Sequence, residues 1–256
     1  MPEATEDTVK FLERAEAAFR DLFDRARSTH ELHFAIALAP EFRGCQDAGW
    51  CTWEESHRAF DEYSAYIERE PPSTFKARVA MSFYCHLSEA SGYYEAPKNM
   101  MRIVGAEKYV MWPFLKLNSS HAATGKVVAP NANKIFRDLV GHAESLGLSD
   151  LAHCFRDAFD PDVRNGYAHA DYILWTDGLR LRRQAGGHPR VISWPDFTQI
   201  LLRGYNFYGI LRQLIAEYVG SYATPKTIRA SMAGEPATDW TIAVDATTGA
   251  FSISTR

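Results

Sequence analysis

Apolar residues recur at helical spacing through most of this chain. Between residues 9 and 26 they fall three or four positions apart with charged residues between them, which predicts an amphipathic helix of about five turns. The segment 30–50 fits either a strand or a short helix, and 109–130 is expected to form a long loop. The same helical spacing predicts further helices over about 53–70, 73–92, 96–105, 131–148 and 149–158.

The periodicity changes after a helix start at Asp160. Aspartate is a favoured helix N-cap, and Pro161 suits the first position of the helix that follows. Beyond His169 apolar residues alternate with polar ones, which is typical of a strand. The pair Asp177-Gly178 divides two such stretches and predicts a β-hairpin over about 171–183.

A long helix and a second hairpin complete the pattern. Ser193 and Asp196 have the spacing of a helix cap, and apolar residues at helical spacing follow as far as Tyr218. Alternation near the C-terminus predicts a hairpin over about 239–254. The predicted fold class is therefore mainly α, a helical bundle with two β-hairpin appendages. We expect an N-terminal helical extension over 1–72 and a helical domain over 73–256, which form one compact unit.

Composition narrows the classes of function. The chain has 256 residues, 46% of them hydrophobic and 13% aromatic, which is enough for a folded core. Its net charge of −4 disfavours a general nucleic-acid coat protein or a membrane-surface binder. The sequence contains no apolar run near the ~18 residues that a membrane span needs, and its N-terminus does not resemble a signal peptide. The sequence therefore predicts a cytoplasmic protein without a membrane partner.

The cysteines and the basic residues add two expectations. Cys45, Cys51, Cys85 and Cys154 show no CxxC spacing, so we expect reduced thiols and no zinc site. The densest basic segment, 179–190, contains no acid, and it could supply counter-charge for an RNA backbone or form a solvated hairpin face. Its arginines, the predicted substrate-binding residues, are Arg180, Arg182, Arg183 and Arg190.

The stretch DPDVRNGYAHAD, residues 160–171, contains the strongest candidate chemistry. On a regular helix Arg164 and His169 would lie about 140° apart, but both would face one cleft if the helix loosens at Gly166 or ends before His169. The arginine fork suits phosphate oxygens, and histidine transfers protons near neutral pH. Together they suffice for RNA cleavage without a metal, by moving the proton of a 2′-hydroxyl or of the 5′-oxygen.

The interval between arginine and histidine is not specific by itself. The same spacing joins Arg25 to His30 and Arg183 to His188. What distinguishes Arg164 is its context, because Asn165 follows directly, a capped helix precedes, and a hairpin and a long helix come after.

That context, over roughly Ser149 to Tyr222, resembles the HEPN superfamily of helical domains, many of which are ribonucleases of toxin–antitoxin and antiviral systems. The motif reads Arg164-Asn165-Gly166-Tyr167-Ala168-His169. The resemblance implies a HEPN-like helical bundle in which Arg164 and His169 are catalytic and Asn165 orients them or binds phosphate. It implies RNA as substrate, no metal or cofactor, and a homodimer in which two motifs share one cleft.

The resemblance has limits within this sequence. It does not extend to residues 1–72 or to the final hairpin. Some toxins of this type carry a tyrosine two residues after the histidine, which a partner enzyme modifies. Here that position is Asp171, and Tyr172 follows it. An antitoxin or another protein partner is therefore an expectation of the superfamily, and that particular modification is not expected here.

Two alternatives remain open from the sequence. In a non-catalytic RNA- or protein-binding module, His169 would interact with the helix dipole and Arg164 would pair with Asp160 or Asp171. In a metal-dependent enzyme, His86 and Glu89 would supply ligands, because they lie three residues apart on one helix face. A further expectation is that three residues line the cleft beside the motif: His86, Glu89 and Tyr172.

Overall fold

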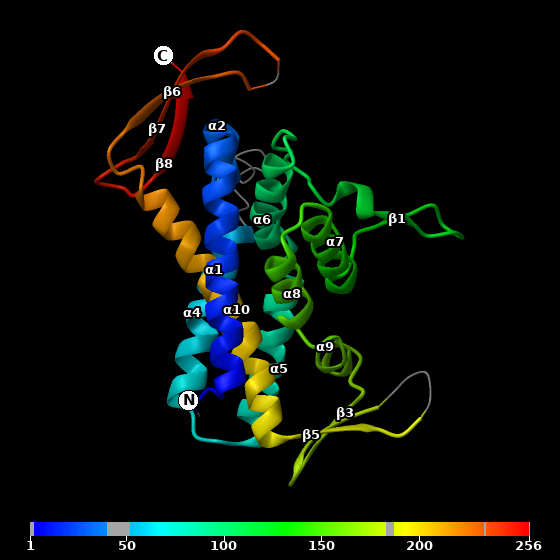
Figure 1. Ribbon diagram of the computed structural model, residues 1–256. Helices are drawn as coiled ribbons and strands as arrows, with labels where there is room; N and C mark the ends of the chain where they lie inside the picture. The colour runs from blue at the N-terminus through cyan, green and yellow to red at the C-terminus, as the bar shows by residue number, and fades with distance from the viewer. Residues whose placement is uncertain (1–2, 40–51, 183–186, 233, 256) are drawn as a thin grey trace.

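The computed structural model describes residues 3–39, 52–182, 187–232 and 234–255. Cys45, Cys51 and Arg183 lie outside these ranges, as does much of the segment 30–50. The prediction of a mainly helical chain is confirmed, and the helices are accompanied by small antiparallel sheets (Figure 1). No helix in the described ranges combines the length and the hydropathy of a membrane span.

Most helices begin at residues whose side chains cap them. Ser73 accepts a hydrogen bond from the Lys76 N–H, Asn131 from the Lys134 N–H and Ser193 from the Asp196 N–H. The described helices are α1 (Glu6–Thr29), α2 (Glu31–Ala37), α4 (Thr52–Arg69), α5 (Thr74–Glu89), α6 (Ser91–Val104), α7 (Ala132–Ser145), α8 (Ser149–Asp157), α9 (Pro161–Ala168) and α10 (Trp194–Gly220).

Two segments differ from the sequence prediction. Helix α6 begins at Ser91, before the expected start near residue 96, and it continues through Pro97. Proline removes a helical hydrogen bond, but Tyr93 and Tyr94 are fully buried and hold the first turns in the core. The expected long loop at 109–130 contains a short 3₁₀ helix, Leu115–Leu117, and two paired strands, β1 (Ser119–Ser120) and β2 (Val127–Val128).

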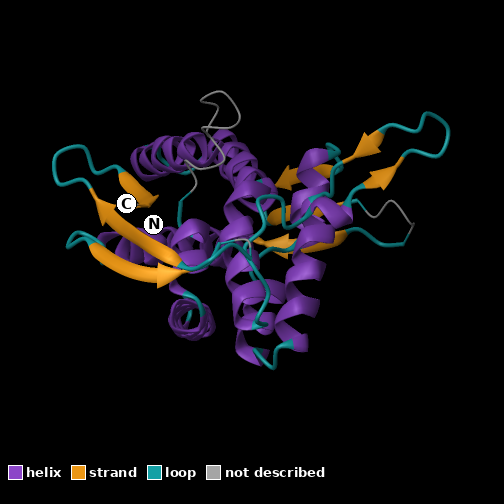
Figure 2. Cartoon of the chain, turned by 90° about the horizontal axis from the view of Figure 1, so that it is seen from above, coloured by secondary structure: helices purple, strands orange, loops and turns teal. Residues whose placement is uncertain are grey.

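Each predicted hairpin segment lies in a three-stranded antiparallel sheet. Strands β3 (Tyr172–Trp175) and β4 (Gly178–Leu181) are joined by β5 (Arg190–Ser193), and β7 (Thr238–Val244) and β8 (Phe251–Thr255) are joined by β6 (Lys226–Ala230). Glycine is required at 178, because a Cβ there would overlap the backbone of Ile192 in β5. The two sheets lie at opposite ends of the bundle (Figures 1 and 2).

Helix α1 packs one face against α6, α8 and α10 and shares the main core with them (Figure 1). Phe19 is fully buried, with its ring centroid 5.7 Å from that of Phe155 in α8 and 5.3 Å from that of Phe207 in α10. A second cluster joins the inner face of β3–β5 to α5, α9 and α10 through residues that include Tyr84, Val163 and Leu181. This second cluster positions the motif helix.

A half-buried histidine in α4 predicts that the protein loses stability in acid. His57 lies beside the rings of Trp53 and Tyr93, and burial, aided by the charge of Arg212, lowers its pKa to about 4. An unfolded chain takes up this proton near pH ~6.5. As pH falls from about 6.5 to 4, the unfolded state therefore binds the proton first, and the free energy of unfolding decreases.

We expect this histidine to account for about 1–2 kcal/mol of the lost free energy of unfolding. This is less than the full pKa shift would give, because the ring is partly exposed and water screens its interactions. The check is urea unfolding of the wild type and of His57→Gln at about pH 7.5 and pH 4.5. The variant should lose less stability than the wild type over this interval, because glutamine does not titrate. Equal losses would show that another group causes the acid sensitivity.

Candidate functional site

The candidate site is built on the short helix α9. Asp160 caps it by accepting hydrogen bonds from the Asp162 N–H at 2.9 Å and the Val163 N–H at 3.1 Å. The helix stays regular through Gly166, where a Cβ would lie 2.5 Å from a methyl carbon of Leu181 in β4. Glycine at this position therefore allows close packing of α9 on the sheet.

His169 follows the last residue of α9 and forms its C-cap, with φ −102° and ψ 5°. The helix thus ends before His169. The imidazole is therefore not held at the angle from Arg164 that a regular helix would impose. As a result Arg164, Asn165 and His169 line one cleft of about 740 Å³. Glu89 from α5 lies in the same wall.

Arg164 is buried, with 6% of its surface exposed. Its Nη1 donates to Glu89 Oε1 and its Nη2 to Asn165 Oδ1, while its Nε has no hydrogen-bond partner among the described residues. Glu89 is itself held in place, because its Oε2 accepts the N–H of Ala132 at the start of α7, at 3.1 Å. The guanidinium therefore pairs with Glu89, and not with Asp160 or Asp171, the partners expected for the non-catalytic alternative.

The His169 side chain is exposed. Its backbone N–H donates to the Asn165 carbonyl at 3.0 Å, which fixes the main chain at the end of α9. Over the described ranges the imidazole has no hydrogen bond or ion pair of its own. It is therefore accessible to a ligand in the cleft.

Arg190 supports the helix start. It donates to Asp160 at 2.6 Å and to Asp162 at 2.9 Å, so one arginine joins β5 to the first turn of α9. The Tyr84 hydroxyl, from α5, accepts the Asp160 N–H. Arg190 lines the cleft, but its charge is already shared by two carboxylates.

Arg180 and Arg182, the other described arginines of the segment 179–190, are also close to acids. Arg180 pairs with Asp177 at 3.1 Å and lies 5.3 Å from the centroid of the Trp175 ring; it is not part of the cleft wall. Arg182 does line the cleft, 3.7 Å from Asp171, with 79% of its side chain exposed. Neighbouring elements thus supply the carboxylates that the segment lacks, and Arg182 is the arginine of the described patch most open to solvent.

Two of the three residues predicted to line the cleft, His86 and Tyr172, lie outside its wall. His86 lies beside Tyr63 of α4, with ring centroids 6.3 Å apart, and is not in the cleft wall; burial lowers its pKa. Tyr172 stacks on Tyr167 at 5.8 Å and is also outside that wall. Because Glu89 faces Arg164, His86 and Glu89 do not converge on one ligand. In the ranges described, no group of three or more His, Cys, Asp or Glu side chains could hold a metal ion.

Sequence reasoning did not identify two asparagines in the cleft wall, Asn131 and Asn133, which stand at the start of α7. It also did not identify Glu89 as the partner of Arg164. That pair joins residues 75 positions apart, so no local pattern reveals it. The described cysteines, Cys85 and Cys154, are free, and burial raises the pKa of each thiol to about 11.

Comparisons with protein-family models, with curated proteins and with solved structures found no match for this chain. The fold and the cleft define a mainly helical protein with an arginine and an exposed histidine at one site. The functional assignment therefore depends on the chemistry of that cleft.

Proposed function

We propose that this protein is a metal-independent endoribonuclease of the HEPN type that cleaves single-stranded RNA. One observation supports this function above the others: Arg164, Asn165 and His169 line a single cleft, in which the imidazole is exposed. A buried guanidinium beside an accessible imidazole combines phosphate recognition with proton transfer.

In the proposed reaction the 2′-oxygen of a ribose attacks the adjacent phosphorus, and the bond from phosphorus to the 5′-oxygen breaks. His169 takes the proton of the 2′-hydroxyl or gives one to the leaving 5′-oxygen. Arg164 stabilises the negative charge that grows on the phosphoryl oxygens, and Asn165 holds the guanidinium through its Nη2. The products are a 2′,3′-cyclic phosphate and a 5′-hydroxyl, so protons and charges balance without a metal.

The protein acts as a homodimer in this proposal. The reaction needs one group that accepts a proton and one that donates, and His169 is the histidine in the described wall of the cleft. A second copy that shares the cleft would supply the other imidazole.

The experiment is to incubate the purified protein with several single-stranded RNAs, with and without EDTA. We expect cleavage that survives EDTA and leaves 2′,3′-cyclic phosphate ends, which mass spectrometry of the fragments detects. Sedimentation velocity of the same preparation measures the dimer. If diverse RNAs remain intact over a range of pH values, the proposed enzyme function is wrong.

A specific observation favours one alternative, a non-catalytic module that binds RNA or a protein. Both Nη groups of Arg164 already donate to protein oxygens, so part of its fork is occupied before any ligand arrives. Phosphates would then be contacted chiefly by Arg182, whose side chain is 79% exposed. Co-sedimentation of intact RNA with the protein, without cleavage in the assay above, is the result that favours this alternative.

A further inference from the structure

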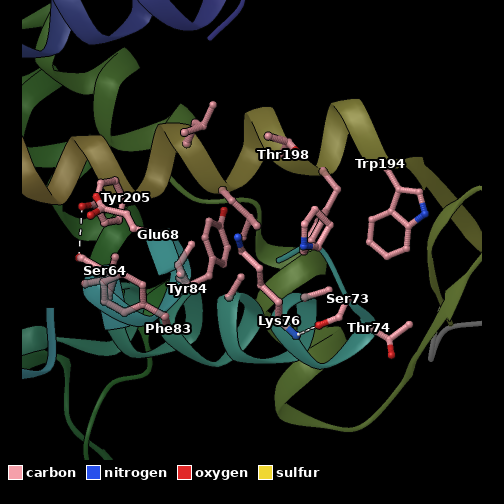
Figure 3. Close-up of a pocket in the computed structure, with 18 residues that line it drawn as sticks. Ser64, Glu68, Ser73, Thr74, Lys76, Phe83, Tyr84, Trp194, Thr198 and Tyr205 are labelled. Carbon is pink, nitrogen blue, oxygen red and sulfur yellow. Dashed lines mark hydrogen bonds between the residues drawn. The ribbon is translucent and has the colours of Figure 1, made fainter. Parts of the chain in front are cut away.

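A second cavity lies between α4, α5 and α10, away from the motif cleft (Figure 3). Its volume is about 430 Å³, which falls within the roughly 300–1,000 Å³ of small-molecule sites. Its walls are mostly apolar: Ile67 comes from α4, Phe83 from α5, and Phe197 and Leu201 from α10. We call this cavity the α5–α10 groove.

The groove exists because one wall carries short side chains. Ala77 and Ala80 both line it from α5, opposite the larger side chains of α10. Alanine side chains do not span the distance to a neighbouring helix, so the space is left for a ligand. A ligand that covers these apolar walls removes them from water, which favours binding by about 25 cal/mol for each Å² of apolar surface buried.

The described lining of the groove contains two charged residues, which differ in their exposure to solvent. Among its described lining residues Lys76 is the only cation and Glu68 the only carboxylate, and Glu68 is exposed. Lys76 is half-buried and reaches from α5 toward α10 (Figure 3). Its Nζ donates to the Glu70 carbonyl at 2.6 Å, and it has no ion pair within the described ranges.

An ammonium group has three protons to donate, so two donors of Lys76 remain for a ligand. Hydrogen bonds between charged partners are about twice as strong as neutral ones, and partial burial strengthens them further. An anionic group beside Lys76 would therefore be bound more strongly than a neutral one, while the apolar walls accept the rest of the molecule.

We propose that the α5–α10 groove binds a small amphiphile, with an anionic head group on Lys76 and an apolar body against Phe83, Phe197 and Leu201. This inference does not depend on the proposed ribonuclease function. It commits to a small molecule because the volume matches such a ligand and the half-buried lysine has no carboxylate of its own.

Two fluorescent probes test the head group directly. 8-Anilinonaphthalene-1-sulfonate and N-phenyl-1-naphthylamine share their aromatic rings, but only the first carries a sulfonate. In Lys76→Gln we expect the dissociation constant of the sulfonate probe to rise about ten-fold, and that of the neutral probe to change less than about two-fold. The matched control is Lys126→Gln, an exposed lysine between β1 and β2, which should alter neither constant.

A third variant, Ala77→Trp, tests the location, because the indole would fill the groove from a half-exposed position. Both probes should then lose binding, while thermal unfolding verifies that each variant is folded. The proposal is overturned if Lys76→Gln and Lys126→Gln behave alike, or if Ala77→Trp leaves both probes bound. It is also overturned if Ala77→Trp changes the sedimenting mass, since the groove would then be an interface between two copies.

Discussion

Replacing His169 with alanine is expected to slow RNA cleavage by about 10²- to 10⁴-fold while leaving the protein folded. The size follows from the loss of a positioned group that transfers a proton in the transition state. The effect on folding is small because the imidazole is exposed and only the His169 backbone is hydrogen-bonded within the described structure. We expect the free energy of unfolding to change by no more than about 0.5 kcal/mol.

The matched control is His153→Ala, because His153 is an exposed histidine on α8 that does not line the cleft. Initial rates on one single-stranded RNA, measured in EDTA, should fall for His169→Ala alone. Arg164 is a less decisive target, since it is buried and its removal disturbs the packing of α9. Equal rates for the wild type and His169→Ala would show that the imidazole takes no part in the reaction.

Local signals in the sequence were sufficient for four helix starts. Ser73, Asn131, Asp160 and Ser193 precede α5, α7, α9 and α10, and each side chain accepts hydrogen bonds from the first turn that it caps. A cap satisfies its partners within three residues, so its effect depends little on the rest of the fold. The sequence therefore predicts these boundaries well.

Elements stabilised from a distance were predicted less well. Helix α6 passes through Pro97 because Tyr93 and Tyr94 are buried among residues of other helices. Strand β6 contains one large apolar residue, Ile228, and its position opposite Trp240 depends on pairing with β7. Neither the burial nor the pairing is expressed in the spacing of nearby residues.

The candidate site also combines a local feature, which the sequence predicts, with a long-range contact, which it does not. Arg164 and His169 reach one cleft through a local event, the end of α9 at Ala168. The partner of Arg164, Glu89, comes from a helix 75 residues earlier, and no spacing rule connects them. The described arginines of the acid-free basic segment, Arg180, Arg182 and Arg190, likewise lie near aspartates that other parts of the chain contribute.

The substitution Glu89→Gln is expected to lower the free energy of unfolding by about 2 kcal/mol. Removing one partner of a buried ion pair commonly costs about 3–5 kcal/mol, because the remaining charge is left without compensation. Here Arg164 has 7% of its side chain exposed, whereas Glu89 has 45%, so water at the carboxylate position replaces part of the lost interaction. The cost comes chiefly from the stranded guanidinium.

Glu55→Gln is the matched control, since Glu55 and Arg58 form an ion pair with 65% and 64% of their side chains exposed. Urea unfolding should show a change below about 0.5 kcal/mol for this variant. The double variant Glu89→Gln/Arg164→Met should be less destabilised than the sum of its two single variants, because no buried charge remains to be compensated. If Glu89→Gln is as mild as Glu55→Gln, then Glu89 does not hold the guanidinium in place, and Arg164 is free to turn toward a ligand in the cleft.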